Sequence, residues 1–230
     1  MTTTLITGAN KGLGREVARR LLADGHDVWI AARDETRGRA AADALGARFV
    51  QLDVTDDASV AAAAQRVTDE TGLDVLVNNA GIAGARRAVE EMAPADIAEV
   101  LATNVLGLVR VTQAFLPLLR RAASPVIVNV SSGMGSLART SDPARLESSL
   151  ISLGYAPSKA AVNMLTTQYA KALPEIRINA VDPGYTATDL NRNRGTQTIE
   201  QGTEAIVAMA EIDASGPTGS FVDRHGVVPW

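Results

Sequence analysis

Cysteine is absent from this 230-residue chain, and histidine and aromatic residues are scarce. Without cysteine, disulfides, thiolate metal ligands and thiol nucleophiles are excluded. The two histidines, His26 and His225, both stand next to a glycine and are expected in surface turns. The pattern supplies no partners that would turn them into a metal site or a Ser-His-Asp triad. Because aromatics make up 3% of the chain and hydrophobic residues 46%, the core is expected to be mostly Ala, Val, Leu and Ile.

Long hydrophobic runs and basic tracts are also missing. The longest apolar stretches fall short of a membrane span, and a strand expected from residue 3 leaves no room for a signal peptide. The net charge of −4, with no basic segment interleaved with aromatics, argues against nucleic acid as a partner. We therefore expect a cytoplasmic protein without a membrane partner, and the sequon at Asn129 is expected to stay unmodified inside a buried strand.

Short β-branched apolar runs alternate with segments of helical periodicity along the whole chain. This alternation predicts βαβ units, hence an α/β fold with a doubly wound parallel sheet, helices on both faces and a single domain over residues 1–230. Acidic pairs at 56–57 and 90–91 open or precede helices, where they complement the helix dipole. The expected strands are 3–7, 28–31, 49–52, 75–77, 126–130 and 176–181, and the expected helices are 15–23, 59–68, 94–119 and 158–173.

Three glycines occur within seven residues between the first strand and the first helix. The segment reads Gly8-Ala9-Asn10-Lys11-Gly12-Leu13-Gly14. Unpaired N–H groups and the helix dipole favour a phosphate at such a place, and glycine lets a pyrophosphate approach the backbone. The spacing differs from Gly-x-Gly-x-x-Gly and lacks the Gly-Lys-Ser/Thr ending of a triphosphate loop. An ordinary strand-to-helix turn remains an alternative at this point.

Tyr155 and Lys159 stand four residues apart, which places them on one face of a helix. A cation beside a phenol favours the phenolate, so Lys159 is expected to lower the pKa of Tyr155 and make it a usable proton donor and acceptor near neutral pH. The same spacing also occurs on solvated helix faces, so the pair alone does not establish a catalytic role.

Taken in order, the motifs of the chain resemble those of the single-domain short-chain dehydrogenases/reductases, in particular the carbonyl-reductase-like branch. The resemblance covers most of the chain and implies a Rossmann fold. The matching residues, in chain order, are Thr7-Gly8-x3-Gly12-x-Gly14, Asp53-Val54, Asn78-Asn79-Ala80-Gly81, Asn104, Ser131-Ser132, Tyr155-x3-Lys159 and Pro183-Gly184 with Thr186 and Thr188.

The resemblance implies a role for each of four catalytic residues. Tyr155 would exchange a proton with the substrate oxygen, and Lys159 would tune it and reach the nicotinamide ribose. Ser132 would hydrogen-bond the carbonyl oxygen, and Asn104 would hold a water that links Lys159 to solvent. Structural alternatives remain open: a turn cap for Ser132, satisfaction of a buried backbone group for Asn104, and a surface position for Lys159.

The resemblance also implies a dinucleotide cofactor, and the second strand favours NADP(H). That strand ends in Ala31-Ala32-Arg33, without the carboxylate that would repel a 2′-phosphate, although Asp34 follows directly. Arg33 and Lys11 are therefore expected to bind the phosphate. The expected function is NADPH-dependent reduction of a ketone or aldehyde, or the reverse oxidation of an alcohol. The alternative is an NADP-binding sensor without turnover.

Residues 185–203 are rich in Asn, Arg, Gly and Thr and are expected to form a mobile substrate lid. Met134, Leu137 and Tyr185 are expected to line the substrate pocket beside it. Nothing in these residues specifies which carbonyl compound or alcohol binds.

We predict a monomer from the length of the segment between Ser132 and Tyr155. Twenty-three positions separate the two residues, whereas tetrameric relatives usually have about ten fewer, and the surplus over Gly133–Gly154 would obstruct the helix face that they share. The C-terminal Pro229-Trp230 also resembles the end of carbonyl-reductase-like monomers. Light scattering at micromolar concentration should give the mass of one chain, and a stable tetramer would refute the prediction.

Overall fold

A computed structural model describes all 230 residues and contains one eight-stranded sheet. The strand order is β3-β2-β1-β4-β5-β6-β7-β8, and every neighbouring pair is parallel except the last. The expected doubly wound fold is confirmed, and the six expected strands lie within one or two residues of their predicted ends. Their bounds are β1 Thr3–Thr7, β2 Asp27–Ala32, β3 Arg48–Gln51, β4 Val75–Asn78, β5 Val126–Val130, β6 Arg177–Val181, β7 Phe221–Asp223 and β8 Gly226–Val227.

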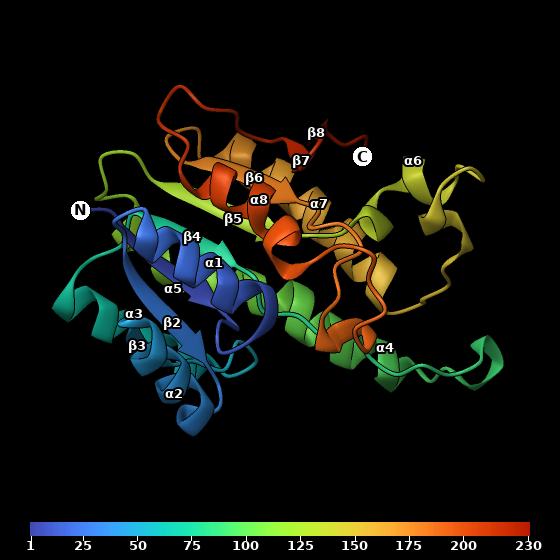
Figure 1. The fold of residues 1–230 in the computed structure, drawn as a ribbon, viewed down its shortest axis with the longest axis horizontal. Helices are drawn as coiled ribbons and strands as arrows, with labels where there is room; N and C mark the ends of the chain where they lie inside the picture. The colour runs from blue at the N-terminus through green and yellow to red at the C-terminus, as the bar shows by residue number, and fades with distance from the viewer.

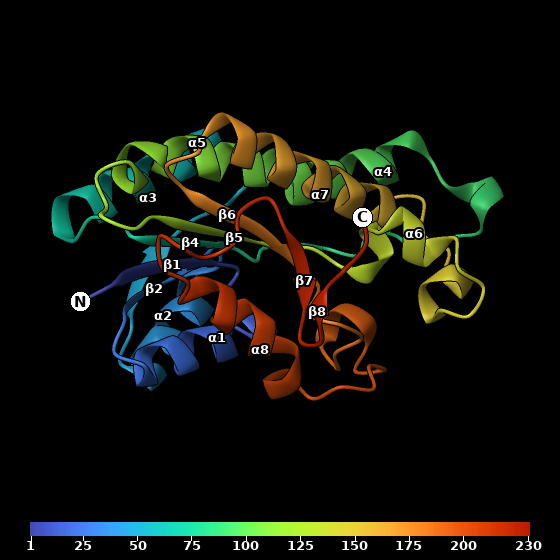
Figure 2. The ribbon, with the colours of Figure 1, turned by 90° about the horizontal axis from the view of Figure 1, so that it is seen from above.

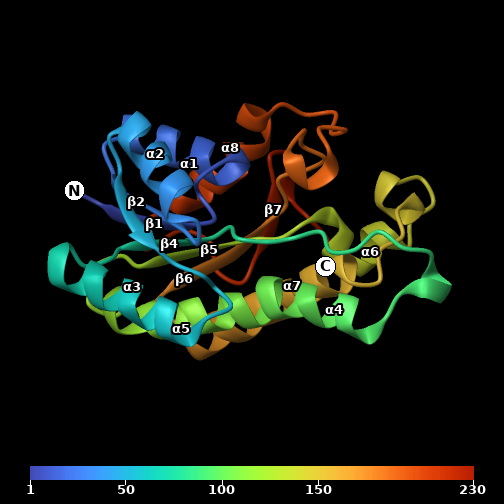
Figure 3. The same ribbon diagram turned by 90° about the horizontal axis from the view of Figure 1, so that it is seen from below.

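Helices cover both faces of the sheet (Figure 1). Seen along the sheet, α1, α2 and α8 lie on one side, whereas α3, α4, α5 and α7 lie on the other (Figures 2 and 3). The bounds are α1 Gly12–Ala23, α2 Glu35–Leu45, α3 Asp57–Glu70, α4 Pro94–Leu101, α5 Gly107–Leu119, α6 Leu137–Thr140, α7 Tyr155–Ala172 and α8 Ile199–Ala210, with single 3-10 turns at Val89–Glu91, Gly133–Gly135, Leu146–Ser149 and Asp189–Asn191.

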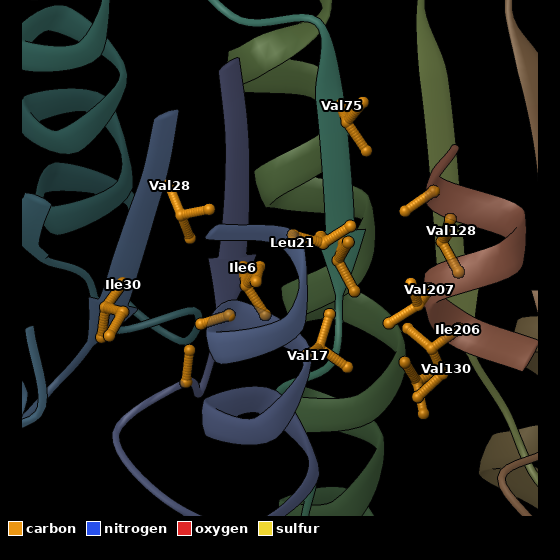
Figure 4. Close-up of a cluster of buried hydrophobic side chains, with 14 of the residues drawn as sticks. Ile6, Val17, Leu21, Val28, Ile30, Val75, Val128, Val130, Ile206 and Val207 are labelled. Atoms are coloured by element: carbon orange, nitrogen blue, oxygen red, sulfur yellow. The ribbon is translucent and has the colours of Figure 1, made fainter. Parts of the chain in front are cut away.

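Two hydrophobic clusters hold these layers together, one on each face of the sheet. Because successive strand residues point to opposite faces, Ile6 belongs to the cluster under α1 and α8, while its neighbour Leu5 belongs to the other. Figure 4 shows the first cluster, in which Val17 and Leu21 of α1 and Ile206 of α8 meet the strands. The aliphatic core expected from the composition is therefore present on both faces.

The helix expected over 94–119 is continuous but irregular. A π-helical turn, η2 (Ala102–Leu106), separates α4 from α5. By length and composition the run Pro94–Leu119 could cross a membrane, contrary to the expectation that every apolar stretch falls short of a membrane span. Core helices pass the same test, and here Val111, Phe115 and Leu119 of α5 are buried against the sheet. The apolar face of this helix is thus explained by packing.

Several smaller expectations need correction. Helix α7 begins at Tyr155 rather than at 158, so Pro157 lies in its first turn, where its missing N–H costs nothing. Residues 199–203 of the expected lid belong to α8, in which Gly202 and Thr203 are buried. His26 is partly buried rather than on the surface, and its Nδ1 atom lies 2.8 Å from the Oγ1 atom of Thr4 in β1.

Candidate active site

The motif residues gather at the carboxyl ends of the parallel strands. The strand order reverses between β1 and β4, and in open α/β sheets ligands bind at such a switch point. Each motif begins within two residues of the end of a strand: the glycine loop follows β1, Arg33 follows β2, Asp53 and Val54 follow β3, Asn79–Gly81 follow β4, Ser132 follows β5, and Pro183–Gly184 follow β6.

The glycine loop is shaped to admit an anion. Gly8 and Gly12 have left-handed φ angles of 66° and 55°, which side chains disfavour. A Cβ atom on Gly14 would lie 2.5 Å from Asn79 Nδ2, so only glycine fits there. Helix α1 begins at Gly12, and its N-cap residue, Lys11, gives no side-chain cap. The first-turn N–H groups are therefore free to receive a phosphate. Asn10 and Leu13, which the sequence also assigns to the cofactor site, lie in the same segment.

Asn79 and Ala80 hold the glycine loop against β4. Both of their backbone N–H groups donate to Thr7 Oγ1 at 3.0 Å, and Asn79 Nδ2 donates to the Thr7 carbonyl at 2.8 Å. Thr7 is itself buried. The resemblance included Thr7 in the loop motif, but its hydroxyl as the anchor of two N–H groups was not foreseen.

A cavity of about 540 Å³ lies at the ends of β2 and β3, and its lining includes Arg33, Asp53 and Arg66. Arg33 is exposed, and its guanidinium has no ion-pair partner. A hydrogen bond from the Thr55 hydroxyl keeps the pKa of Asp53 below its usual value. Arg33 and Asp53 thus share one cavity, as the motifs predict.

Val54 does not line that cavity. It is buried against α5, where a Cβ on Gly107 would lie 2.8 Å from Val54 Cγ2. The close approach of helix and loop fixes the turn that presents Asp53. Asp34, the acid that follows Arg33, caps α2 and pairs with Arg37 at 2.8 Å. The negative charge of Asp34 is therefore partly neutralised by Arg37.

Lys11 is already paired in this structure. Its Nζ atom lies 2.8 Å from Asp189 Oδ2, and both side chains are more than half exposed. The pair links the glycine loop to the segment 185–198. Exposed ion pairs contribute about 0–1 kcal/mol, so a phosphate can compete for Lys11 at small cost.

Tyr155 and Lys159 occupy the first two turns of α7, as expected. Lys159 is 5% exposed, and its Nζ atom donates to the Val130 carbonyl at 2.8 Å and lies 5.6 Å from the centre of the Tyr155 ring. Burial lowers the pKa of Lys159 to about 8. A surface position for Lys159 is therefore wrong.

The expected lowering of the Tyr155 pKa is also wrong for this structure. Burial raises the pKa of Tyr155 to about 12, against the lowering effect of the Ser132 hydroxyl and together with the raising effect of the Asp182 charge. Lys159 stands over the ring and donates to a backbone carbonyl, so its charge does not offset the burial of the phenol. At neutral pH Tyr155 therefore keeps its proton.

Asn104 lies inside the π-helical turn and links two segments of the site. Its Oδ1 accepts from the Ile82 N–H at 2.9 Å, and its Nδ2 donates to the Ile82 carbonyl and to Ser158 Oγ, both at 3.0 Å. Ser158 Oγ in turn donates to the Tyr155 carbonyl at 2.6 Å. The side chain thus satisfies backbone groups, as the structural alternative supposed, and also fixes the start of α7. Ser158 carried no signal in the sequence.

A water-sized cavity of about 10 Å³ adjoins Asn104 and Lys159. Asn78 also lines it, and the buried Oδ1 atom of Asn78 has no hydrogen-bond partner. Gly81 lies close to both side chains, because a Cβ there would lie 3.3 Å from Asn104 Oδ1 and 3.6 Å from Lys159 Nζ. The cavity could hold the water that the resemblance assigns to Asn104, with Asn78 as one of its partners.

Ser132 and the segment after β6 flank Tyr155. Ser132 Oγ accepts from the Met134 N–H at 3.2 Å, so it caps the following turn while its hydroxyl acts on the Tyr155 pKa. After β6, Gly184 has a left-handed φ of 70°. Thr186 is buried and donates to the Pro183 carbonyl at 2.9 Å.

Thr188 lies on the glycine-loop side of the same segment. It precedes the turn Asp189–Asn191, and its backbone N–H donates to Asn191 Oδ1 at 3.3 Å. A Cβ atom on Gly12 would lie 4.0 Å from Thr188 Cγ2. Of the residues expected to line a substrate pocket, Met134 and Tyr185 are partly buried, and Leu137 is 73% exposed.

The comparisons with known proteins agree with this geometry. Residues 2–199 match the family described as short chain dehydrogenase. The chain is 33% identical to (+)-neomenthol dehydrogenase of Arabidopsis thaliana, over 97% of this chain and 96% of that protein. It is 34% identical to the NADPH carbonyl reductase 3 of Rattus norvegicus, over 98% and 97%. The structure of an NADPH-bound carbonyl reductase from chicken fatty liver superposes with a TM-score of 0.87 at 30% identity, over 100% and 99% of the two chains.

The buried ammonium of Lys159 makes a prediction about stability. A lysine whose pKa is lowered on folding from 10.5 to about 8 destabilises the fold while it is charged, and this penalty fades as pH rises from about 8 towards 10.5. The free energy of unfolding of the wild type should therefore increase relative to Lys159→Met by about 2 kcal/mol between pH 7 and pH 10.

Denaturant unfolding of both proteins at several pH values measures this difference. Lys171→Met is the control, because Lys171 is an exposed lysine in the last turn of the same helix. A stability difference between wild type and Lys159→Met that is constant across this pH range would contradict the burial of a charged ammonium.

Proposed function

The chain belongs to the short-chain dehydrogenase family, and from this premise we propose that it is an NADPH-dependent oxidoreductase that reduces a ketone or aldehyde. The observation that carries the proposal is the pairing of Tyr155 with the buried ammonium of Lys159 beside Ser132, at the strand ends where the glycine loop lies. The sensor alternative is not favoured, because the site keeps both Tyr155 and Lys159 and the relatives are named as reductases and dehydrogenases.

The residues at the strand ends fit a dinucleotide phosphate. The glycine loop would hold the pyrophosphate at the start of α1, and Arg33 and Lys11 would hold a 2′-phosphate. Asp53 would lie on the adenine side, and Lys159 would bind the nicotinamide ribose. The remaining part of the dinucleotide would be surrounded by Asn79–Gly81, Pro183–Gly184, Thr186 and Thr188. When bound, NADPH supplies the hydride.

The protein's own residues would supply and position the proton. Because Tyr155 keeps its proton at neutral pH, it is in the form that reduction requires, and it would donate to the substrate oxygen as negative charge develops there. The Ser132 hydroxyl would hold the same oxygen, and Asn104 would keep the first turn of α7 in place through Ser158. In the reverse oxidation of an alcohol, Tyr155 would take the proton back from the substrate oxygen.

Residues 185–198, which run from Tyr185 to the cap of α8, would act as the substrate lid. We also propose that the protein acts as a monomer on a small carbonyl or alcohol substrate in the cytoplasm.

Replacement of Tyr155 tests the chemical step. Tyr155→Phe keeps the ring and removes the hydroxyl, so kcat should fall by about 100-fold or more while NADPH binding survives. Lys159→Ala should damage both, because it also removes the anchor of the nicotinamide ribose. Carbonyl screening by NADPH absorbance finds the substrate, and fluorescence titration gives the NADPH dissociation constant. Wild-type turnover by Tyr155→Phe on that substrate would refute the site.

Arg33 tests the preference for NADPH over NADH. A charge-assisted contact to the 2′-phosphate contributes about 1.5–3 kcal/mol, so Arg33→Ala should weaken NADPH binding about tenfold or more and leave NADH binding nearly unchanged. Arg66→Ala is the control, because Arg66 lines the same cavity but pairs with Glu70 at 2.9 Å. The preference would be disproved by equal kcat/KM of the wild type for the two cofactors.

A further inference from the structure

A buried arginine connects the segment between Ser132 and Tyr155 to the residue that follows β6 and to β7. Arg139, on the short helix α6, is 11% exposed in its side chain. Its Nη1 atom lies 2.7 Å from Asp182 Oδ2, and its Nη2 atom lies 2.6 Å from Asp223 Oδ2 on β7. Glu147 Oε1 stands 3.6 Å from the same Nη1 atom. One guanidinium thus joins three separate parts of the chain.

Asp182 passes this contact on to the segment after β6. It directly precedes Pro183-Gly184, and its Oδ1 atom accepts from the Gly184 N–H at 2.9 Å. Gly184 has a φ of 70°, so the turn depends on this local hydrogen bond as well as on glycine. The carboxylate of Asp182 therefore has one oxygen on Arg139 and the other on the backbone of the turn.

The same cluster touches the backbone directly after Ser132. A Cβ atom on Gly133 would lie 2.5 Å from Glu147 Oε1, 3.0 Å from Asp182 Oδ2 and 3.3 Å from Arg139 Nη1. Gly133 is buried. The ion cluster is therefore in contact with both backbone segments that flank Tyr155, one from β5 and one from β6.

Stability alone is a poor explanation for such a cluster. Buried ion pairs often contribute little net stability, because removing each charge from water costs several kcal/mol. Burial indeed raises the pKa of Asp182, against the effects of two backbone N–H groups and Arg139. What a two-pronged guanidinium does supply is a fixed geometry between its partners.

We propose that Arg139 is a positioning residue for carbonyl reduction. Through Asp182 it fixes the turn Pro183–Gly184, and through the ion cluster it fixes Gly133, the residue that follows Ser132. The distance between these two segments, which flank Tyr155, is thereby held constant. This inference rests on the proposed function. Trp230 also contacts the helix that carries Arg139: the Ala138 N–H donates to the Trp230 carbonyl at 3.1 Å, and Figure 2 shows the C-terminus beside α6.

The first experiment separates positioning from folding by steady-state kinetics. Arg139→Met should lower kcat about 10- to 100-fold, because a displacement near 1 Å can have that effect on a reaction. The NADPH dissociation constant should rise by a smaller factor, because Pro183–Gly184 is only one of the segments that would contact the cofactor. Arg139→Lys keeps the charge but reaches fewer partners, so its kcat should lie between those of the wild type and Arg139→Met.

Arg145→Met is the matched control. Arg145 is 43% exposed, and its Nε atom lies 3.7 Å from Glu147 Oε2, whereas its pairing does not include Asp182. Its removal should leave kcat unchanged. If Arg139→Met folds and keeps wild-type kcat, the proposal is refuted. If Arg139→Met does not fold, a wild-type kcat in Arg139→Lys refutes it, and an intermediate kcat supports it.

Hydrogen exchange provides a readout that does not require activity. In Arg139→Met the Gly184 amide should exchange at least about tenfold faster, because its acceptor Asp182 loses its anchor, while the amides of β5 keep their protection. Unchanged protection at Gly184 would overturn the proposal even if the enzyme were impaired. If no carbonyl compound is reduced by the wild type, the proposed function fails, yet this measurement still decides whether Arg139 holds the turn.

Discussion

The burial of one ammonium group is the constraint on which the site depends. Lys159 is almost completely buried, and its Nζ atom donates a hydrogen bond to the Val130 carbonyl at the end of β5. This contact ties the second turn of α7 to the sheet and thereby sets where Tyr155 stands at the start of the helix. Burial lowers the pKa of Lys159, and the partial burial of Tyr155 raises the pKa of its phenol.

The doubly wound parallel sheet and the gathering of the motifs at one of its edges could be predicted from the sequence, whereas the spatial order of the strands was not predicted. Parallel strands buried on both faces are continuous β-branched runs, and in this fold class their carboxyl ends must meet at one edge. Gly8, Asp53, Asn79, Ser132 and Pro183 therefore could be assigned to one rim before any coordinate was known. The glycine loop could also be predicted from the sequence, because its close contacts leave a mark there. The contact of Gly14 with Asn79, for example, excludes every larger residue.

What could not be predicted concerns burial and long-range partners. The depth of Tyr155, which decides its pKa, is a property of the packed protein and leaves no mark on residues 155–159. Arg139 is 43 positions from Asp182 and 84 from Asp223, and arginines and aspartates are scattered over the whole chain. Only the fold selects these partners. Ser158 was missed for the same reason, because its partner Asn104 comes from another helix.

The π-helical turn at Ala102–Leu106 has a geometric consequence for the whole helix. A π-turn accommodates one residue more than an α-turn does, which shifts the rotational phase of everything beyond it by about 100°. Helix α5 turns Phe115 towards the sheet, whereas α4, on the other side of the phase shift, packs Val100 near Gly84 and Gly154. The continuous helical run can therefore present apolar side chains to two differently oriented surfaces, the core under the sheet and the backbone at Gly84 and Gly154, with Asn104 between the two helices.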